Sequence, residues 1–280
     1  MYRVPTELIR AALEEDGAWN DITTLSTVPE QELAEAHIVT RREGVIAGLM
    51  VAAEVFRTFD ARVQVEMLVA EGSHVGPNAV LAHISGPARS ILSAERVALN
   101  FLGHLSGIAT QTNRCVRALE GTRARMLDTR KTTPGLRALE KAAVQLGGGQ
   151  NHRFGLHDGV LIKDNHIKAA GGVAQAVRAA RGQAPHLLKI EVECETLTDV
   201  REALEAQADV ILLDNMEVAT MRSAVELIRA QAPRVLIEAS GNIGTDPAKL
   251  AAVAATGVDF ISSGALTHSA PNFDISLEFA

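Results

Sequence analysis

The chain has 280 residues, of which 47% are hydrophobic, and a formal net charge of -7. This length and apolar content support one large or two smaller globular domains, and the acidic balance argues against general nucleic-acid binding. Two cysteines fit no disulfide framework, and no run approaches the roughly 18 uncharged apolar residues of a membrane span, so the sequence predicts a soluble cytoplasmic protein.

The first part of the chain, up to about residue 105, mixes helix and strand patterns. Residues 1–17 have charges within an apolar pattern, which indicates an amphipathic helix and not a signal peptide. A turn-rich segment at 70–77 resembles the β-hammerhead of lipoyl and biotinyl carriers, but it has no lysine, which favours a structural role. Periodicity predicts strands at Ala34–Thr40, Gly44–Ala47, Arg62–Leu68 and Val80–Ile84, and helices at Met50–Phe59 and, broken by Gly103 and Gly107, at Ile91–Leu119.

From about Arg123 apolar strands alternate with alanine-rich amphipathic helices, which predicts parallel βα units. The expected strands are Ala124–Leu127, Val160–Ile162, Leu187–Val192, Val210–Leu213, Val235–Ala239 and Val258–Ile261. The expected helices are Leu136–Leu146, Val173–Ala180, Thr198–Ala206, Ala219–Ala230 and Pro247–Ala255. Six strands, with a further candidate near Gly147–Gly149, favour closure into a barrel over a small flavodoxin-like sheet.

Each expected strand of this second part is followed by a polar or charged residue. Ordinary polar loops would explain one or two such positions, but not the recurrence of lysine, glutamate and aspartate directly after apolar runs. In α/β barrels the carboxyl ends of the strands bind ligands, so we expect a site there. The residues concerned are Asp128–Lys131, Lys163–Asn165, Glu193, Asp214–Asn215, Ser240–Asn242 and Ser263–Gly264.

Cations and carboxylates at these positions indicate an anionic substrate. Arg130 offers a planar fork that suits a carboxylate, and the neighbouring Lys131 offers a compact charge that suits a phosphate. Glu191 and Glu193 share one face of their strand. Glu193 and Asp214 fit Mg²⁺, directly or through water, and salt bridges to lysine explain them equally well.

Two glycine-containing loops, Ser240–Gly244 and Ser262–Gly264, come between a strand and helical sequence. Backbone N–H groups in such loops bind phosphate, although small residues also occur in plain tight turns. The spacing of His152, His157 and His166 matches no known pattern of zinc ligands, which argues against a zinc site. Lys163 follows an apolar strand and is a candidate Schiff-base lysine, as in barrel aldolases.

The combined motifs resemble quinolinate phosphoribosyltransferase, also called nicotinate-nucleotide pyrophosphorylase (carboxylating). The matching segments are Glu95–Leu102, Ser106–Thr110, Asp128–Gly135, Gly147–Arg153, Leu161–His166, Leu213–Asn215, Glu238–Gly241 and Gly257–Ser269. The resemblance implies an N-terminal α/β sandwich domain (1–107, completed by 270–280) and an open α/β barrel of fewer than eight strands (108–269). It also implies a homodimer, and a reaction of quinolinate and phosphoribosyl pyrophosphate to nicotinate mononucleotide, pyrophosphate and CO₂.

The resemblance further implies the role of each site residue. Quinolinate would meet Arg130, His152, Arg153 and Lys163, with Arg96 of the other subunit. Lys131, Glu193 and Asp214 would serve ribose, pyrophosphate and Mg²⁺, and together with Lys163 they form the expected catalytic set. The phosphate would be held by Ser240, Gly241 and Gly264, with Thr129, Asn242, Ser263 and His268 also expected at the substrates.

Two positions depart from the family pattern, because Asn242 replaces a usual glycine and Ala142 a usual aromatic residue. A related molybdenum-transport-associated group shares the fold, but Thr129–Lys131 and Asn151–Arg153 favour the NAD-pathway enzyme. A Schiff-base lyase that uses Lys163, or a non-catalytic sensor of phosphate ligands, would be the alternatives.

Overall fold

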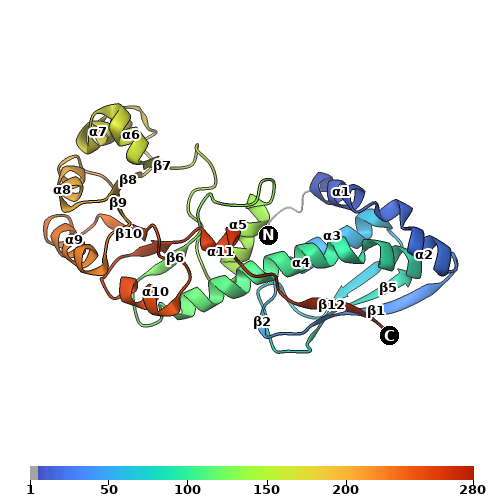
Figure 1. The fold of residues 1–280 in the computed structure, drawn as a ribbon. Coiled ribbons are helices and arrows are strands. Elements are labelled where there is room, and N and C mark those ends of the chain that lie inside the picture. The colour runs from blue at the N-terminus through green and yellow to red at the C-terminus, as the bar shows by residue number, and fades with distance from the viewer. Residues whose placement is uncertain (1–5) are drawn as a thin grey trace. The chain divides into compact units, whose positions relative to one another are not determined.

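The computed structural model describes residues 6–280, and the chain divides into two compact units. The first unit contains the chain up to residue 113 together with 133–148 and 270–280, and the second contains 114–132 and 149–269. Figure 1 labels the elements of both. Of the helix expected at 1–17, residues 1–5 lie outside the described part, and α1 (Thr6–Glu15) confirms the remainder.

A four-stranded antiparallel sheet forms the base of the first unit. In spatial order its strands are β12 (Ile275–Phe279), β1 (Leu33–Thr40), β5 (Val80–Pro87) and β3 (Gln64–Met67). β12 comes from the far end of the sequence and pairs with β1, with Leu277 opposite Ile38. The turn-rich segment contributes β4 (His74–Val75), which pairs with β2 (Gly44–Val45).

Helices cover one side of this sheet (Figure 1). They are α1, α2 (Ile22–Thr27), α3 (Leu49–Phe59) and α4 (Ala88–Arg117), with a short 3-10 turn at Ala18–Asn20 and α5 (Arg137–Leu146) in the same unit. The amphipathic pattern of α1 buries Ile9 and Leu13, and α3 buries Leu49, Val55 and Phe56. Burial of these aliphatic side chains supplies most of the driving force for packing.

The helix expected at Ile91–Leu119 is present as α4, but the breaks expected at its two glycines are wrong. α4 runs through Gly103 and Gly107 without interruption. Both glycines face residues 271–273 of the chain. A Cβ atom on Gly107 would lie 2.2 Å from the Pro271 carbonyl oxygen, and the Phe273 N–H donates to the Gly103 carbonyl at 2.9 Å. The glycines therefore serve close backbone approach and not termination of the helix.

The second unit is built on a six-stranded parallel sheet. Its spatial order is β6 (Arg125–Leu127), β11 (Phe260–Ser262), β10 (Leu236–Ser240), β9 (Val210–Asp214), β8 (Ile190–Cys194) and β7 (Val160–Ile162). Within the described residues no hydrogen-bonded ladder joins the edge strands β6 and β7, so the barrel is open. The closed barrel that the strand pattern favoured is therefore wrong, and the open barrel that the family resemblance implied is confirmed. The further strand suspected near Gly147–Gly149 is only a single bridge between Leu127 and Gln150.

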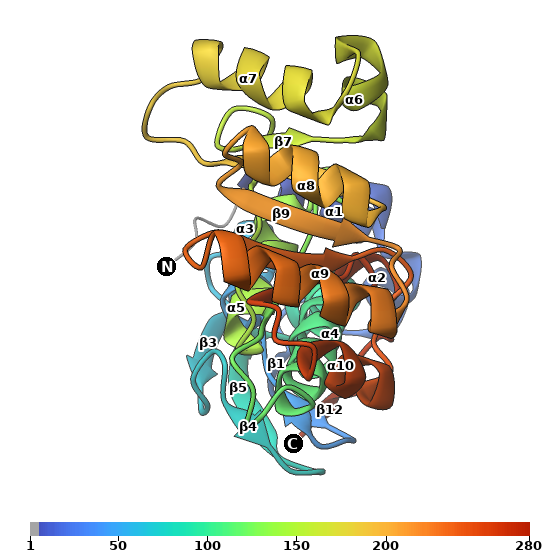
Figure 2. The same ribbon diagram turned by 90° about the vertical axis from the view of Figure 1, so that its left-hand side faces the viewer.

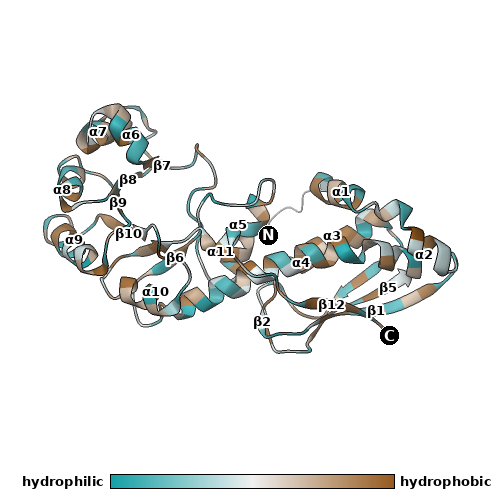
Figure 3. Ribbon diagram, viewed as in Figure 1, coloured by the Kyte–Doolittle hydropathy of each residue, from teal (hydrophilic) through white to brown (hydrophobic). Residues whose placement is uncertain are grey.

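Helices lie along the outer side of this sheet, as Figure 2 shows for α7 to α10. The helices of this unit are α6 (Asp164–Ala170), α7 (Val173–Gln183), α8 (Leu197–Glu205), α9 (Val218–Gln231) and α10 (Pro247–Ala254), and the short α11 (Ala265–His268) follows β11. Figure 3 shows that these helices carry both hydrophilic and hydrophobic residues, as expected where one face covers a sheet. None of the helices in residues 6–280 is long and apolar enough to cross a membrane.

The expected strand at Leu187–Val192 begins three residues late, at Ile190. Pro185 starts a turn in which its carbonyl accepts the Leu188 N–H at 2.9 Å, and Leu187 is 84% exposed. The apolar run therefore spans a turn and a strand, which hydrophobicity alone does not separate.

The close approach at Gly107 yields a test of the first unit. Gly107→Ala should lower the free energy of unfolding by about 1–3 kcal/mol, because the added methyl group meets a backbone carbonyl that cannot rotate away. Urea unfolding followed by circular dichroism would measure this loss. Gly182→Ala is the matched control, since Gly182 lies in α7 with nothing within 4 Å of its Cβ position. Equal stability of the two variants would contradict the packing described here.

Candidate active site

A cavity of about 650 Å³ opens at the carboxyl ends of the strands of the second unit. Every strand of the parallel sheet ends at or near it, so the sheet brings together side chains that are far apart in the sequence. Its lining consists of Thr129, Arg130, Lys131, His152, Arg153, Leu161, Lys163, Asp164, Glu193, Glu195, Leu212, Asp214, Asn215, Glu238, Ser240, Gly241, Asn242 and Ser262. Most of the residues predicted at the strand ends therefore line one cavity, whereas Asp128, Asn165, Ser263 and Gly264 are not part of its lining.

Two guanidinium groups give one part of this cavity a concentrated positive charge. Arg130 and Arg153 each have a buried Nε atom without a hydrogen-bond partner among the described residues. Arg153 donates through Nη1 to the Gly159 carbonyl at 2.9 Å. Burial lowers the pKa of the Arg153 guanidinium, and the neighbouring charge of Arg130 lowers it further. Two adjacent, half-buried cations, each with a buried Nε–H that has no partner among the described residues, form a site for an anion with several oxygen atoms.

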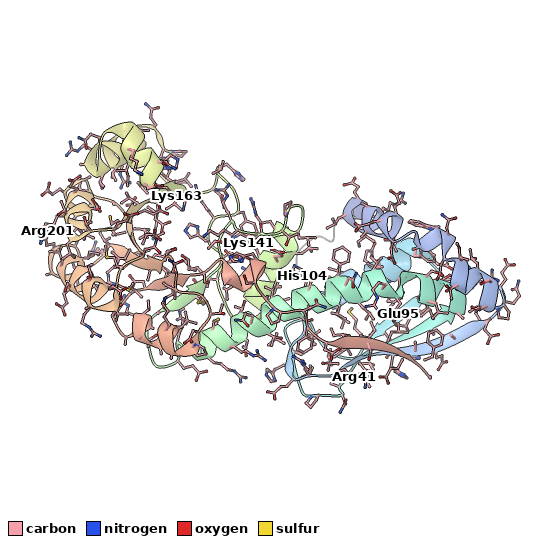
Figure 4. All side chains as sticks on the ribbon, in the orientation of Figure 1. Arg41, Glu95, His104, Lys141, Lys163 and Arg201 are labelled. Carbon is pink, nitrogen blue, oxygen red and sulfur yellow. The ribbon has the colours of Figure 1, made fainter. Side chains whose placement is uncertain are left out.

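Lys163 follows β7 at the start of α6, where Figure 4 labels it. Its ammonium lies 2.7 Å from Glu193 Oε1, and the other Glu193 oxygen accepts the Asp164 N–H at 3.3 Å. The Lys163 side chain is 47% exposed and the Glu193 side chain 12% exposed. The salt bridge to lysine that the sequence left open for Glu193 is thus present, and Lys163 is its partner.

Asp214 ends β9 next to Glu193, and its carboxylate accepts a hydrogen bond from Asn215 Nδ2 at 2.6 Å. Burial raises the pKa of the Asp214 carboxyl, and the negative charge of Glu193 raises it further. The two carboxylates therefore repel each other, and a cation between or beside them would relieve that repulsion. Oxygen ligands of this kind suit Mg²⁺.

The loop after β10 is fixed by Asn215. Asn215 has a left-handed backbone (φ 53°), and its Oδ1 accepts the Asn242 N–H at 3.1 Å. Gly241 also has positive φ, and a Cβ on it would lie 2.4 Å from Asn215 Oδ1. Asn242 is not among the residues with positive φ, so its departure from the family's glycine requires no unusual conformation here.

The loop after β11 brings Lys131 next to Gly264 and His268. A Cβ on Gly264 would lie 2.8 Å from Lys131 Cδ and 3.0 Å from His268 Nε2. The Thr267 hydroxyl donates to the Lys131 carbonyl at 2.7 Å. Ser263, buried, Gly264 and His268 do not themselves line the cavity, and Lys131 is the group that joins them to it.

His152 lies deeper, against two buried carboxylates. Its Nε2 is 3.0 Å from Glu191 Oε2 and 3.7 Å from Glu238 Oε2, and its Nδ1 accepts the Arg153 N–H at 2.7 Å. Both ring nitrogens therefore have partners within the protein. His157 and His166 do not join this group, which in residues 6–280 is the one set of three metal-capable side chains close together.

Arg96 lies on α4 in the first unit, the helix on which Figure 4 labels Glu95 and His104. It lines a separate cavity of about 500 Å³ with Leu92, Ser93 and residues 16–18 and 20–23. Asn100 and His104, which lie one turn apart on the same helix, line a smaller cavity of about 260 Å³. Neither cavity has the cluster of cations and carboxylates that distinguishes the one at the strand ends.

Sequence reasoning did not assign roles to three residues that organise the site. Asn215 was noted only as the end of a strand, and Glu238 only as part of a motif. Asp128 is fully buried and accepts hydrogen bonds from Asn151 Nδ2 at 2.5 Å and from the His152 N–H at 2.8 Å. A charged residue directly after a buried strand was the available signal for Asp128, but its partners depend on the tertiary fold.

Comparison with known proteins places the chain among relatives of matching length. It is 48% identical to a probable nicotinate-nucleotide pyrophosphorylase (carboxylating) of Synechocystis sp., over 89% of this chain and 83% of the relative. It is 45% identical to the Mycobacterium leprae nicotinate-nucleotide pyrophosphorylase (carboxylating), over 97% and 96% of the two chains. The crystal structure of the nicotinate-nucleotide pyrophosphorylase from Ehrlichia chaffeensis superposes with a TM-score of 0.93 at 38% identity and covers 100% of both chains.

The family models divide the sequence in two. Residues 21–106 match the N-terminal domain of quinolinate phosphoribosyl transferase, and residues 108–278 match its C-terminal domain. Together with the cavity at the strand ends, these matches show that the chain belongs to the quinolinate phosphoribosyltransferase family.

Proposed function

We propose that this chain transfers the phosphoribosyl group of phosphoribosyl pyrophosphate to quinolinate, with loss of CO₂, to give nicotinate mononucleotide in NAD biosynthesis. The observation that carries the proposal is the pair of half-buried arginines, Arg130 and Arg153, whose buried Nε atoms have no partner within the described chain. Quinolinate has two adjacent carboxylates, which complement two adjacent cations.

Quinolinate would lie against the cationic side of the cavity. Arg130 and Arg153 would each pair with a carboxylate, and Lys163 would add a third positive charge, held in place by Glu193 at 2.7 Å. His152 contributes to the same wall. Exclusion of water from such a pocket strengthens each of these charge interactions.

Phosphoribosyl pyrophosphate would occupy the other side of the cavity. The backbone of Ser240–Asn242 would hold its 5′-phosphate, with Ser263, Gly264 and His268 bounding the neighbouring loop, and Thr129 and Lys131 would face the pyrophosphate. Gly241 has a positive φ, which glycine adopts readily, and its lack of a side chain leaves room for the phosphate to approach the backbone.

The carboxylates of Glu193 and Asp214 fit a magnesium ion, because both are hard oxygen donors in the same cavity and repel each other when ionised. We propose that they hold Mg²⁺ directly or through its water molecules. When bound, the ion would supply positive charge that neutralises the pyrophosphate.

The reaction needs charge stabilisation and not a side-chain nucleophile. Bond breaking at the ribose anomeric carbon develops positive charge on the sugar, which Glu193 and Asp214 would stabilise, and negative charge on the leaving pyrophosphate, which Lys131 would stabilise. As CO₂ leaves, the electron pair of the C2–carboxylate bond remains on C2, where the adjacent pyridinium charge formed by ribosylation stabilises it, and C2 then takes a proton from water. The protein contributes orientation and water exclusion to that step.

The two alternative functions fit the geometry less well. A Schiff-base lyase needs an unprotonated lysine, whereas Lys163 is in an ion pair with Glu193. A non-catalytic sensor would not need a subsite for two carboxylates next to one for phosphate. Release of ¹⁴CO₂ from carboxyl-labelled quinolinate, with and without phosphoribosyl pyrophosphate, tests the proposal, and absence of release in the presence of both substrates and Mg²⁺ would overturn it.

We further propose a homodimer in which Arg96 reaches the quinolinate of the neighbouring subunit, as the family resemblance implies. Such an exchange is reciprocal in a two-fold dimer. We also propose that the protein acts in the cytoplasm, because Cys115 and Cys194 are both buried free thiols.

The charge of the cavity predicts strong discrimination between two similar acids. Nicotinate has one carboxylate and would leave part of the Arg130, Arg153 and Lys163 cluster unpaired, at a cost of about 1–3 kcal/mol for each unpaired group. We therefore expect kcat/KM for quinolinate to exceed that for nicotinate by at least about a hundredfold. Steady-state assays with each acid at saturating phosphoribosyl pyrophosphate would measure the ratio. Comparable efficiency with both acids would contradict the assignment of the carboxylate subsite.

The carboxylate pair predicts a specific metal phenotype. Asp214→Asn should raise the Mg²⁺ concentration needed for half-maximal rate and lower kcat, with little change in quinolinate affinity, because in this proposal Asp214 serves ribose and metal and not the carboxylates of quinolinate. Rate measurements across a Mg²⁺ series and calorimetric titration of quinolinate would separate these effects. Glu205→Gln, on the exposed side of α8, makes the same chemical change away from the cavity and should alter neither. A large loss of quinolinate affinity with unchanged Mg²⁺ dependence would show that Asp214 orients Lys163 instead.

A shared active site predicts recovery of activity in mixed dimers. Arg96→Ala and Lys131→Ala homodimers should each be nearly inactive. Refolding equal amounts together gives heterodimers in about half of the dimers, and each heterodimer has one intact site, so about a quarter of wild-type activity should return. Native mass spectrometry would verify subunit exchange. Verified exchange without recovered activity would show that Arg96 acts within its own subunit.

A further inference from the structure

Two carboxylates lie below the proposed quinolinate subsite and have no part in the reaction described above. Glu191 on β8 is 7% exposed and Glu238 on β10 is 2% exposed. The two strands flank β9, on which their register partners are Val210 and Leu212. Each carboxylate retains one oxygen, Oε1, with no hydrogen-bond partner in the described part of the chain.

Two adjoining carboxylates at this depth cannot both carry unbalanced charge. Burial raises the pKa of the Glu238 carboxyl well above its usual range, and the charge of Glu191 raises it further. Both carboxylates lie against the same ring. His152 Nε2 is 3.0 Å from Glu191 Oε2 and 3.7 Å from Glu238 Oε2.

The hydrogen bonds of His152 determine which of its nitrogens carries the proton. Nδ1 accepts the Arg153 N–H at 2.7 Å and so bears no hydrogen, which leaves the hydrogen on Nε2, directed at the carboxylates. The backbone N–H of His152 donates to Asp128 at 2.8 Å. His152 is thereby held at its ring and its backbone, and its Nδ1 in turn holds the backbone of Arg153.

We propose that Glu191 and Glu238 are positioning residues that fix the His152 ring and, through it, place the Arg153 guanidinium for a substrate carboxylate. The His152 Nδ1 accepts the backbone N–H of Arg153, so a change in the contact between His152 and Glu191 also affects the placement of Arg153. This inference deepens the proposed function and rests on it, since it identifies what holds one of the two cations of the carboxylate subsite.

The contact itself is tested without any assay of activity. In protein labelled with ¹⁵N-histidine, with the His152→Gln variant used to assign the signal, the His152 ring of the wild-type protein should show a protonated Nε2 and a bare Nδ1 at pH 7. A proton on Nδ1 or on both nitrogens would overturn the proposal. His152, Glu191 and Glu238 could instead hold a metal ion, so the purified protein should also be analysed for metals. A divalent ion that is bound in stoichiometric amount and lost in Glu191→Leu would overturn the proposal.

The consequence for the substrate is tested by a split in kinetic constants. Glu191→Leu removes the acceptor of the His152 proton and should raise KM for quinolinate roughly tenfold, while KM for phosphoribosyl pyrophosphate stays within about twofold. Glu191→Gln is the matched control, since its amide oxygen still accepts that proton, and it should restore quinolinate KM to within about threefold of wild type. Equal rises in both KM values, or a Gln variant as impaired as Leu, would overturn the positioning role.

Failure of the proposed function gives a different result. If the wild-type protein releases no CO₂ from quinolinate, the proposed function is wrong. The NMR signal of the His152 ring would still show whether the two carboxylates fix that ring. If Glu191→Leu does not fold, Glu238→Leu tests the same KM split, and the wild-type ring signal stands independently of either variant.

Discussion

The active site depends on holding like charges next to each other at the ends of one sheet. Arg130 stands beside Arg153, and Asp214 beside Glu193, so each pair repels while the cavity is empty. Repulsion of this kind opposes folding, and it is offset by the aliphatic core beneath the strand ends and by hydrogen bonds that hold the chain around the charges. In the proposed function, the substrates and Mg²⁺ would relieve this repulsion, which would favour their binding. A parallel sheet suits this purpose, because its rigid strands set the spacing of charges that would otherwise move apart.

Much of this arrangement could be predicted from the sequence because it follows from periodicity. Apolar strands followed at once by lysine, glutamate or aspartate placed Lys163, Glu193 and Asp214 at one edge, and the structure gathers all three in one cavity. The register of a parallel sheet brings strand ends together whatever the details of the loops. Family motifs supplied the chemistry of the substrates, which periodicity does not contain.

The remainder depended on contacts between residues far apart in the chain. Glycine in α4 normally indicates a break, but the partner of Gly107 is Pro271, more than 160 positions later. Asn215 was not distinguishable from any polar residue after a strand, although it joins Asp214 to the loop after β10. Glu191 and Glu238 look alike in the sequence, and only their burial and their shared neighbour His152 distinguish them from the carboxylates proposed to face the substrates.

The pairing of β12 with β1 has a consequence for synthesis of the chain. β1 is complete by residue 40, but its outer neighbour begins at Ile275, so more than 230 residues are translated before that edge is covered. The second unit contains no residue beyond 269, so its parallel sheet does not depend on β12. Until β12 arrives, β1 offers unpaired backbone groups that invite pairing with another nascent chain. A chaperone that shields extended segments would therefore have most to protect in the earliest-made part of the protein.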